Sequence, residues 1–229
     1  MKKYIVLFSL LLMSIAYAAT VFADLNGATI TAGPGETQAQ HAAGSYVAQG
    51  GNITMVNITG KSQTRVWQGF YGKTSGSLTL DDASGNTMYN WTLANRSGIV
   101  LVSRTNALNF TSITGITDCT VDEDLQGSNY KRSDRVNKTF TRNNSISWDV
   151  GGYTITDACQ TWTYNSSGFT RAFEEIMVNV TNAYSAYATK IQNDSIGFNG
   201  QTVDYQLIVP ETKQKSQTTT YYFYVEFTG

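Results

Sequence analysis

Charged residues, prolines, cysteines and histidines are all scarce in this chain of 229 residues. Only 14% of the residues are charged, and 16 Lys+Arg nearly balance 17 Asp+Glu, so the chain lacks the basic surface that a nucleic-acid-binding protein needs. This low charge, with 12% aromatic residues, argues against a disordered chain. Two prolines, and twenty glycines without a triplet repeat, exclude collagen and proline-rich linkers.

The shortage of histidine and cysteine restricts the available catalytic chemistry. His41, the single histidine, lies in a Gly/Ala/Gln-rich stretch, a poor place for the general base of a hydrolytic triad. Paired carboxylates would suffice for a glycoside hydrolase, but Asp81-Asp82 lie in a predicted turn and Glu174-Glu175 are sequence neighbours, which point to opposite faces of a strand. The chain is therefore predicted to be non-enzymatic and to need no cofactor.

Cys119 and Cys159 are the only cysteines. In a secreted chain an even pair predicts one disulfide, and closing a loop of this length is worth roughly 4 kcal/mol in the chain-entropy model. A zinc site is poorly supported, because two thiols and one distant histidine do not make a four-ligand shell.

One acidic stretch partly matches a calcium-binding loop. Asp122, Asp124 and Gln126, followed by Gly127, stand at positions 1, 3, 5 and 6 of that spacing. The match fails at position twelve, where Ser133 replaces the bidentate Glu. A solvated acidic turn is the preferred interpretation, and no metal site is predicted.

Residues 1–23 have the features of a secretory signal peptide. A short cationic start precedes a mostly apolar stretch from Tyr4 to Ile15, and cleavage sites with small residues follow at Ala18 and Ala23, of which we take Ala23. The alternative is an uncleaved anchor, because Tyr4 to Ala23 carries no charge and is long enough to span a bilayer. The expected location is extracellular or at the cell surface, and an uncleaved signal segment would be the only contact with a membrane.

Asparagine supports the same location. Ten of the seventeen asparagines begin an N-x-[ST] sequon, where a random third residue would give roughly four. The excess predicts N-glycosylation of a secreted surface, although Asn and Thr are also abundant in polar β-proteins. The ten sites are Asn52, Asn57, Asn90, Asn95, Asn109, Asn137, Asn143, Asn165, Asn179 and Asn193.

Alternating strand patterns cover most of the mature chain. Turn residues at 81–86 and at Asn199-Gly200 predict hairpins, and Glu174 to Met177 is compatible with either a strand or a helix start. Strands are expected at 25–32, 52–58, 64–71, 77–80, 87–93, 98–103, 145–148, 160–164, 172–180, 195–198, 201–209 and 218–228.

The predicted organisation is a signal peptide (1–23), an extended N-terminal segment and linker (24–51), and a single β-sandwich domain (52–229). A less regular insertion at about 106–152 carries candidate short helices at 122–125 and 133–137, the second with Ser133 as its N-cap. The predicted fold is all-β, an antiparallel β-sandwich of Ig-like or jelly-roll-like type, preceded by an N-terminal signal helix.

Two blocks carry a family resemblance. Residues 50–54, 62–72, 77–82 and 85–91, with the C-terminal strand 220–226, resemble uncharacterised secreted archaeal cell-surface proteins. The likeness covers about a third of the chain. It implies an archaeal cell-surface or extracellular context, and brings no activity or catalytic residue with it.

These observations predict a secreted, N-glycosylated, non-enzymatic surface or structural protein: an adhesin, an envelope component or a filament subunit that associates with itself or with other surface proteins. Residues 25–32, tethered by the flexible stretch 33–51, would add as a strand to a neighbour's sheet or pair within their own domain. The second hypothesis is a carbohydrate-binding module that uses exposed Trp67 and Trp91, with glycans as partners. The third is a secreted glycoside hydrolase.

Overall fold

The computed structural model describes residues 25–39, 42–93, 95–126, 132–168, 170–180, 184–212 and 217–228. Strands account for 41% of the structure and helices for 3%, and the sheets are antiparallel, which confirms the predicted all-β, sandwich-like fold. The predicted signal peptide and its helix lie outside the described residues. In the described part of the chain, no helix has the length and apolar character needed to cross a membrane.

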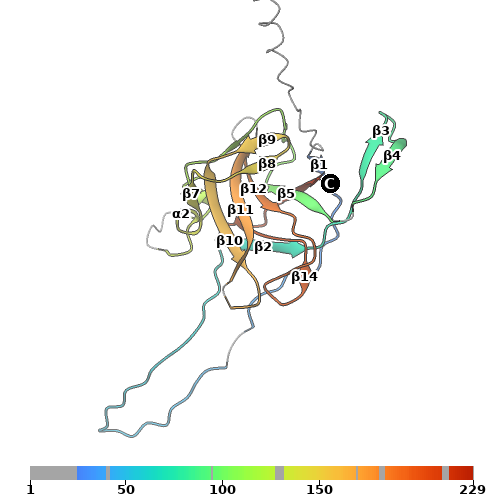
Figure 1. The fold of residues 1–229 in the computed structure, drawn as a ribbon. Coiled ribbons are helices and arrows are strands. Elements are labelled where there is room, and N and C mark those ends of the chain that lie inside the picture. The colour runs from blue at the N-terminus through green and yellow to red at the C-terminus, as the bar shows by residue number, and fades with distance from the viewer. Residues whose placement is uncertain are drawn as a thin grey trace, which may run out of the picture.

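An eight-stranded antiparallel sheet forms the centre of the fold (Figure 1). Its hydrogen-bonded order is β1-β16-β5-β12-β11-β10-β7, and β6 pairs with β11 beside this path. In chain order the strands are β1 (Asn26–Gly27), β5 (Ser97–Ser103), β6 (Ile113–Gly115), β7 (Thr141–Asn143), β10 (Ala158–Tyr164), β11 (Arg171–Val180), β12 (Tyr184–Lys190) and β16 (Tyr222–Thr228).

Both faces of the central sheet are buried. Strand β5 shows this clearly, because Ile99 and Leu101 belong to one hydrophobic cluster while Val100 and Val102 belong to the other. The first cluster lies under the hairpin of β8 (Trp148–Val150) and β9 (Tyr153–Ile155), and the second under the two-stranded sheet of β2 (Trp67–Gly72) and β15 (Tyr205–Pro210). The continuous apolar run at 98–103 is thus a strand that is buried on both faces, as predicted.

Two predicted hairpins are present. β3 (Leu78–Asp81) and β4 (Thr87–Trp91) flank the Asp82–Asn86 turn, and β13 (Ser195–Ile196) and β14 (Thr202–Val203) flank Asn199-Gly200. Gly85 and Gly200 adopt φ values of +80° and +82°, a backbone conformation that L side chains rarely adopt. The strand predicted at 201–209 is interrupted at Asp204, whose backbone N–H turns to the carbonyl of Gly72.

The two short helices occur close to their predicted positions. The first is η1 (Glu123–Gln126) and the second is α2 (Val136–Thr139). Ser133 is not the N-cap of α2, since that position is taken by Arg135, which makes no side-chain capping bond. The helix alternative for Glu174–Met177 is wrong, because β11 is paired on both sides and continues through them.

Two N-terminal strand predictions need correction. Only Asn26–Gly27 of the predicted 25–32 strand pairs, and it pairs with Val225 and Tyr224 of its own domain. Residues 52–58 form no strand, although their composition favours one, and they pair with no strand of the described chain. The β-propensity of this segment is therefore not satisfied among the described residues.

The predicted disulfide between Cys119 and Cys159 is confirmed, with a Cα–Cα distance of 5.6 Å. Cys159 is fully buried on β10, whereas Cys119 lies in the irregular insertion. The bond therefore fixes the insertion to the central sheet.

Candidate functional site: the exposed arm and the aromatic hairpin

The most unusual part of the molecule is the chain between β1 and β2. Residues 29–65, which we call the arm, contain no helix or strand among their described residues, and every one of these residues is exposed. Figure 1 shows the arm running out from the body and returning to β2. Loops this long without secondary structure are uncommon in compact domains and are usually functional when they are not disordered.

Both ends of the arm are attached to the body. The N–H of Ala28 donates to the carbonyl of Phe223 at 2.9 Å, and the N–H of Glu211 donates to the carbonyl of Val66 at 2.9 Å. The Thr64 hydroxyl also donates to the Asp134 carboxylate at 2.7 Å. The arm is therefore a long excursion between two fixed points.

Four of the seven exposed large apolar side chains of the arm lie between residues 53 and 58. Met55 is 84% exposed and Ile58 is 90% exposed, and Ile53 and Val56 are exposed as well. The segment Asn52–Ile58 contains no charge and no proline, a composition typical of strands that pair with other chains. Contiguous apolar surface of this kind marks an interaction site.

A second apolar surface lies on the β3–β4 hairpin. Leu78 is paired with Trp91 and Leu80 with Tyr89, so these four side chains share one face. The Tyr89 and Trp91 rings lie 4.9 Å apart between centroids, and they are 59% and 45% exposed. Trp91 was a predicted ligand residue but its neighbours were not, although the alternation of Leu78 with Leu80 and of Tyr89 with Trp91 is a signal for a shared face.

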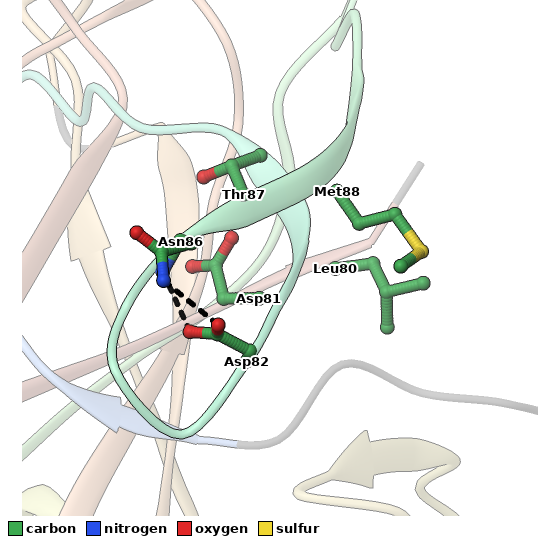
Figure 2. A pocket seen from close by; sticks show the side chains of 6 residues that line it. All are labelled: Leu80, Asp81, Asp82, Asn86, Thr87 and Met88. Atoms are coloured by element: carbon green, nitrogen blue, oxygen red, sulfur yellow. Dashed lines mark hydrogen bonds between the residues drawn. The ribbon is translucent and has the colours of Figure 1, made fainter.

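The tip of this hairpin is polar on one side and apolar on the other. Figure 2 shows Leu80 and Met88 side by side, with Asp82 turned toward Asn86. Asp82 accepts bonds from the Asn86 side chain and from the backbone N–H groups of Asn86 and Ser84, each at 2.8 Å. These bonds hold the pKa of Asp82 below its usual value, the side-chain bond from Asn86 contributing most. An open pocket of about 400 Å³ lies here, lined by Leu80, Asp81, Asp82, Asn86, Thr87 and Met88.

Trp67 is structural rather than a ligand platform. Its indole N–H donates to the carbonyl of Asp134 at 2.6 Å, and its ring stacks on Phe140 with centroids 6.2 Å apart. Both contacts attach the start of β2 to the insertion near α2. Of the two predicted ligand tryptophans, only Trp91 presents its ring to solvent.

The sequons differ in accessibility. Six sequon asparagines are exposed: Asn52, Asn57, Asn90, Asn95, Asn109 and Asn137. The other four, at Asn143, Asn165, Asn179 and Asn193, are partly buried. Asn179 is the extreme case, because it lies within β11 between β12 and β6, and its side-chain oxygen is buried.

The calcium candidate has its described side chains occupied by the protein. Asp122 accepts bonds from Arg104, from the Ser185 hydroxyl at 2.7 Å and from the Tyr187 hydroxyl at 2.7 Å. Gln126 donates to the carbonyl of Val66 at 3.1 Å and accepts from the N–H of Val136 at 3.0 Å. The Asp124 side chain and Gly127 lie outside the described residues.

The candidate acid pair Glu174 and Glu175 is separated by the sheet, as the strand interpretation required. Glu174 pairs with Lys190 at 3.0 Å, while Glu175 is completely buried on the opposite face, where burial raises its pKa well above the usual value. The second acid candidate, Asp81, accepts a bond from the Thr79 hydroxyl at 3.0 Å in the exposed hairpin. No group of three or more His, Cys, Asp or Glu that could hold a metal ion is found among the described residues, and His41 is not among them.

Comparison with protein-family models, with curated proteins and with solved structures finds no match to this chain. Its function must therefore be inferred from its own residues and geometry.

Proposed function

We propose that this chain is a secreted, N-glycosylated, non-enzymatic structural protein of the cell surface, whose copies associate through the arm in an envelope layer, an adhesin or an extracellular filament. The observation that carries the proposal is the exposed apolar segment Asn52–Ile58. An archaeal surface is the proposed context, on the resemblance of residues 50–54, 62–72, 77–82 and 85–91 and of the C-terminal strand.

The exposure of the apolar side chains in this segment favours association with a partner. A buried aliphatic side chain is worth about 1.5–3 kcal/mol relative to an exposed one, and Ile53, Met55 and Ile58 gain none of this in the single chain. Association that covers them would recover part of that free energy. The arm also lies outside the body, so a neighbour can reach it without unfolding the domain (Figure 1).

The donor segment that we propose for strand addition lies further along the chain than residues 25–32. The sequence left residues 25–32 open to addition to a neighbour's sheet or to pairing within their own domain, and Leu25 is buried in the core while Asn26–Gly27 pair with β16 of the same domain. Residues 52–58 are the better donor, because they have strand-forming composition and no partner strand among the described residues.

The proposed association can be tested on the purified mature protein by light scattering and electron microscopy. Replacing residues 52–58 by a Gly/Ser sequence of equal length should abolish assembly, while the same replacement of residues 33–39 should leave it intact. Both segments are exposed and irregular, so neither change removes a core contact. Assembly that survives the first replacement would show that the arm is not the interface.

A carbohydrate-binding function is the second candidate, favoured by the exposed Tyr89 and Trp91 rings beside the polar residues of the hairpin tip. A glycan array on the wild type and on Trp91→Ala tests it. Binding that is lost in Trp91→Ala supports the candidate, whereas no binding by the wild type disposes of it. This readout does not depend on assembly.

A further inference from the structure

Strand β2 is an edge strand, and hydrogen bonds across the β2–β15 pair show which of its backbone groups face outward. Gly69 lies opposite Ile208, whose N–H donates to Glu175 at 3.0 Å instead of to Gly69. Three residues away on each strand, the N–H of Glu211 does donate to the carbonyl of Val66. Opposite pairs in an antiparallel ladder alternate between bonded and non-bonded, so Trp67, Gly69 and Tyr71 direct their N–H and C=O groups away from β15.

The two edges of this small sheet differ in whether other parts of the described chain cover them. The outward edge of β15 lies over the central sheet, where the Glu175 carboxyl covers the N–H of Ile208. Along the outward edge of β2 no other strand of the described chain lies, and the carbonyl of Gly69 accepts only the exposed side-chain amide of Gln68, at 2.7 Å. The six residues of β2 include no charge and no proline, the usual devices that keep an edge from pairing.

Aromatic side chains lie on both faces of β2. On the inner face Phe70 packs edge-on against Tyr221 and Phe223, with centroids 5.4 and 5.1 Å away. On the other side Tyr71 meets Phe198 at 5.0 Å, and both rings are exposed. A strand added at this edge would therefore find aromatic neighbours above and below.

The arm segment matches these requirements. In an extended conformation Ile53 and Met55 point to one face, and Val56 and Ile58 to the other. The segment has seven residues and β2 has six, so the two are of nearly equal length. Sequons at Asn52 and Asn57 do not prevent pairing, because strand side chains leave from the faces of a sheet and not from its edge.

We propose that residues 52–58 of one copy add as a strand to the outer edge of β2 of a second copy. This rests on the proposed function and names the acceptor for it. Donor and acceptor are different surfaces, so each copy offers one of each and the contact is heterologous. Repetition of such a contact gives an open chain of subunits unless the rotation closes a ring.

Cross-linking identifies the two surfaces directly. Both native cysteines are bonded to each other, so an engineered cysteine is the only free thiol. Met55→Cys protein is mixed with Gln68→Cys protein and treated with a short bis-maleimide. We expect a heterodimer whose linked peptides contain residues 55 and 68. Replacing Gln68→Cys by Thr87→Cys, on the exposed β4 strand, is the matched control and should give none. A link found only within single chains of a Met55→Cys/Gln68→Cys double variant would overturn pairing between copies.

A charge at the edge gives an independent test. A Cβ at Gly69 would lie 3.9 Å from its nearest neighbours, and Gly69 does not have a positive φ, so Gly69→Lys fits the folded chain. We expect roughly tenfold weaker association, equivalent to about 1.4 kcal/mol, with an unchanged unfolding temperature. Ser84→Lys on the hairpin turn is the control for charge. If the wild type assembles, Gly69→Lys assembles equally well and no cross-link forms between residues 55 and 68, then β2 is not the acceptor, while the proposed function stands. A wild type that stays monomeric refutes both.

Discussion

The carboxyl group of Glu175 accepts a hydrogen bond from the backbone N–H of Ile208 at 3.0 Å, and thereby connects β11 of the central sheet to β15 of the layer above it. Glu175 is completely buried, and its second oxygen has no partner among the described residues. Desolvation raises its pKa well above the usual value, because burial disfavours the charged form of the carboxyl group.

We expect Glu175→Gln to fold with little loss of stability, because an amide oxygen still accepts the Ile208 N–H. Glu175→Ala should lose about 2–4 kcal/mol of unfolding free energy, since it leaves a cavity and an unpaired N–H. The wild type should also become less stable as pH rises above the unfolded pKa of a glutamate, because the folded state then binds more protons than the unfolded state. Urea unfolding from pH 4 to 8 measures both effects. A Glu175→Gln variant with the same pH slope as the wild type would contradict this role.

Asp204 should show the opposite pH dependence. Burial alone raises its pKa, but bonds from the N–H groups of Asp194 and Thr74, from the Thr74 hydroxyl and from nearby Arg96 lower it further than burial raises it. Its contribution to stability is therefore present above the unfolded pKa and lost as pH falls through the folded value. Asp204→Ala should cost about 2–3 kcal/mol at pH 7 and progressively less below pH 4. Thermal unfolding of both proteins at pH 7 and pH 3 compares the two costs, and equal costs would argue against this account.

Reduction of the Cys119–Cys159 bond should loosen the insertion first, since the bond fixes Cys119 of the insertion to Cys159 of β10. A 40-residue separation corresponds to roughly 4 kcal/mol of stability in the chain-entropy model. The double variant Cys119→Ser/Cys159→Ser should therefore unfold at a clearly lower urea concentration. Hydrogen exchange should show the greatest loss of protection in residues 116–126, and uniform loss across the central sheet would contradict this order.

Glycans are expected on the six exposed sequons and not on Asn179. An acceptor asparagine must reach the glycosylation enzyme, whereas the Asn179 side chain lies within a paired central strand. Glycopeptide mass spectrometry of protein secreted by its native host gives the occupancy of each site. Only 14% of the residues are charged, so enzymatic removal of the glycans should lower solubility. A fully occupied Asn179 would show that modification precedes the pairing of β11.

Some features were predictable because the pattern of one short segment determines them. The apolar run at 98–103 predicted burial on both faces, Asp82 and Gly85 predicted a turn, and the even pair of cysteines predicted a bond. Each of these depends on neighbours along the chain or on a simple count. Sequence reasoning therefore placed them correctly.

Other features depend on which distant segments meet. Residues 52–58 have the composition of a strand, but their composition does not show whether another strand of the chain pairs with them. The outward direction of the Gly69 backbone follows only from the Ile208–Glu175 bond, which joins residues 33 positions apart. The isolated Gly69 within a strand pattern was the one available signal, since such a glycine often marks close backbone approach.

The most direct test of the central claim is the weight-average mass of the mature protein by light scattering over a dilution series, compared with that of Ile53→Asp/Ile58→Asp. Both residues are exposed in the single chain, so the double variant should fold normally and remain monomeric at concentrations where the wild type forms large assemblies. Equal masses for the two proteins at every concentration would contradict association through the arm.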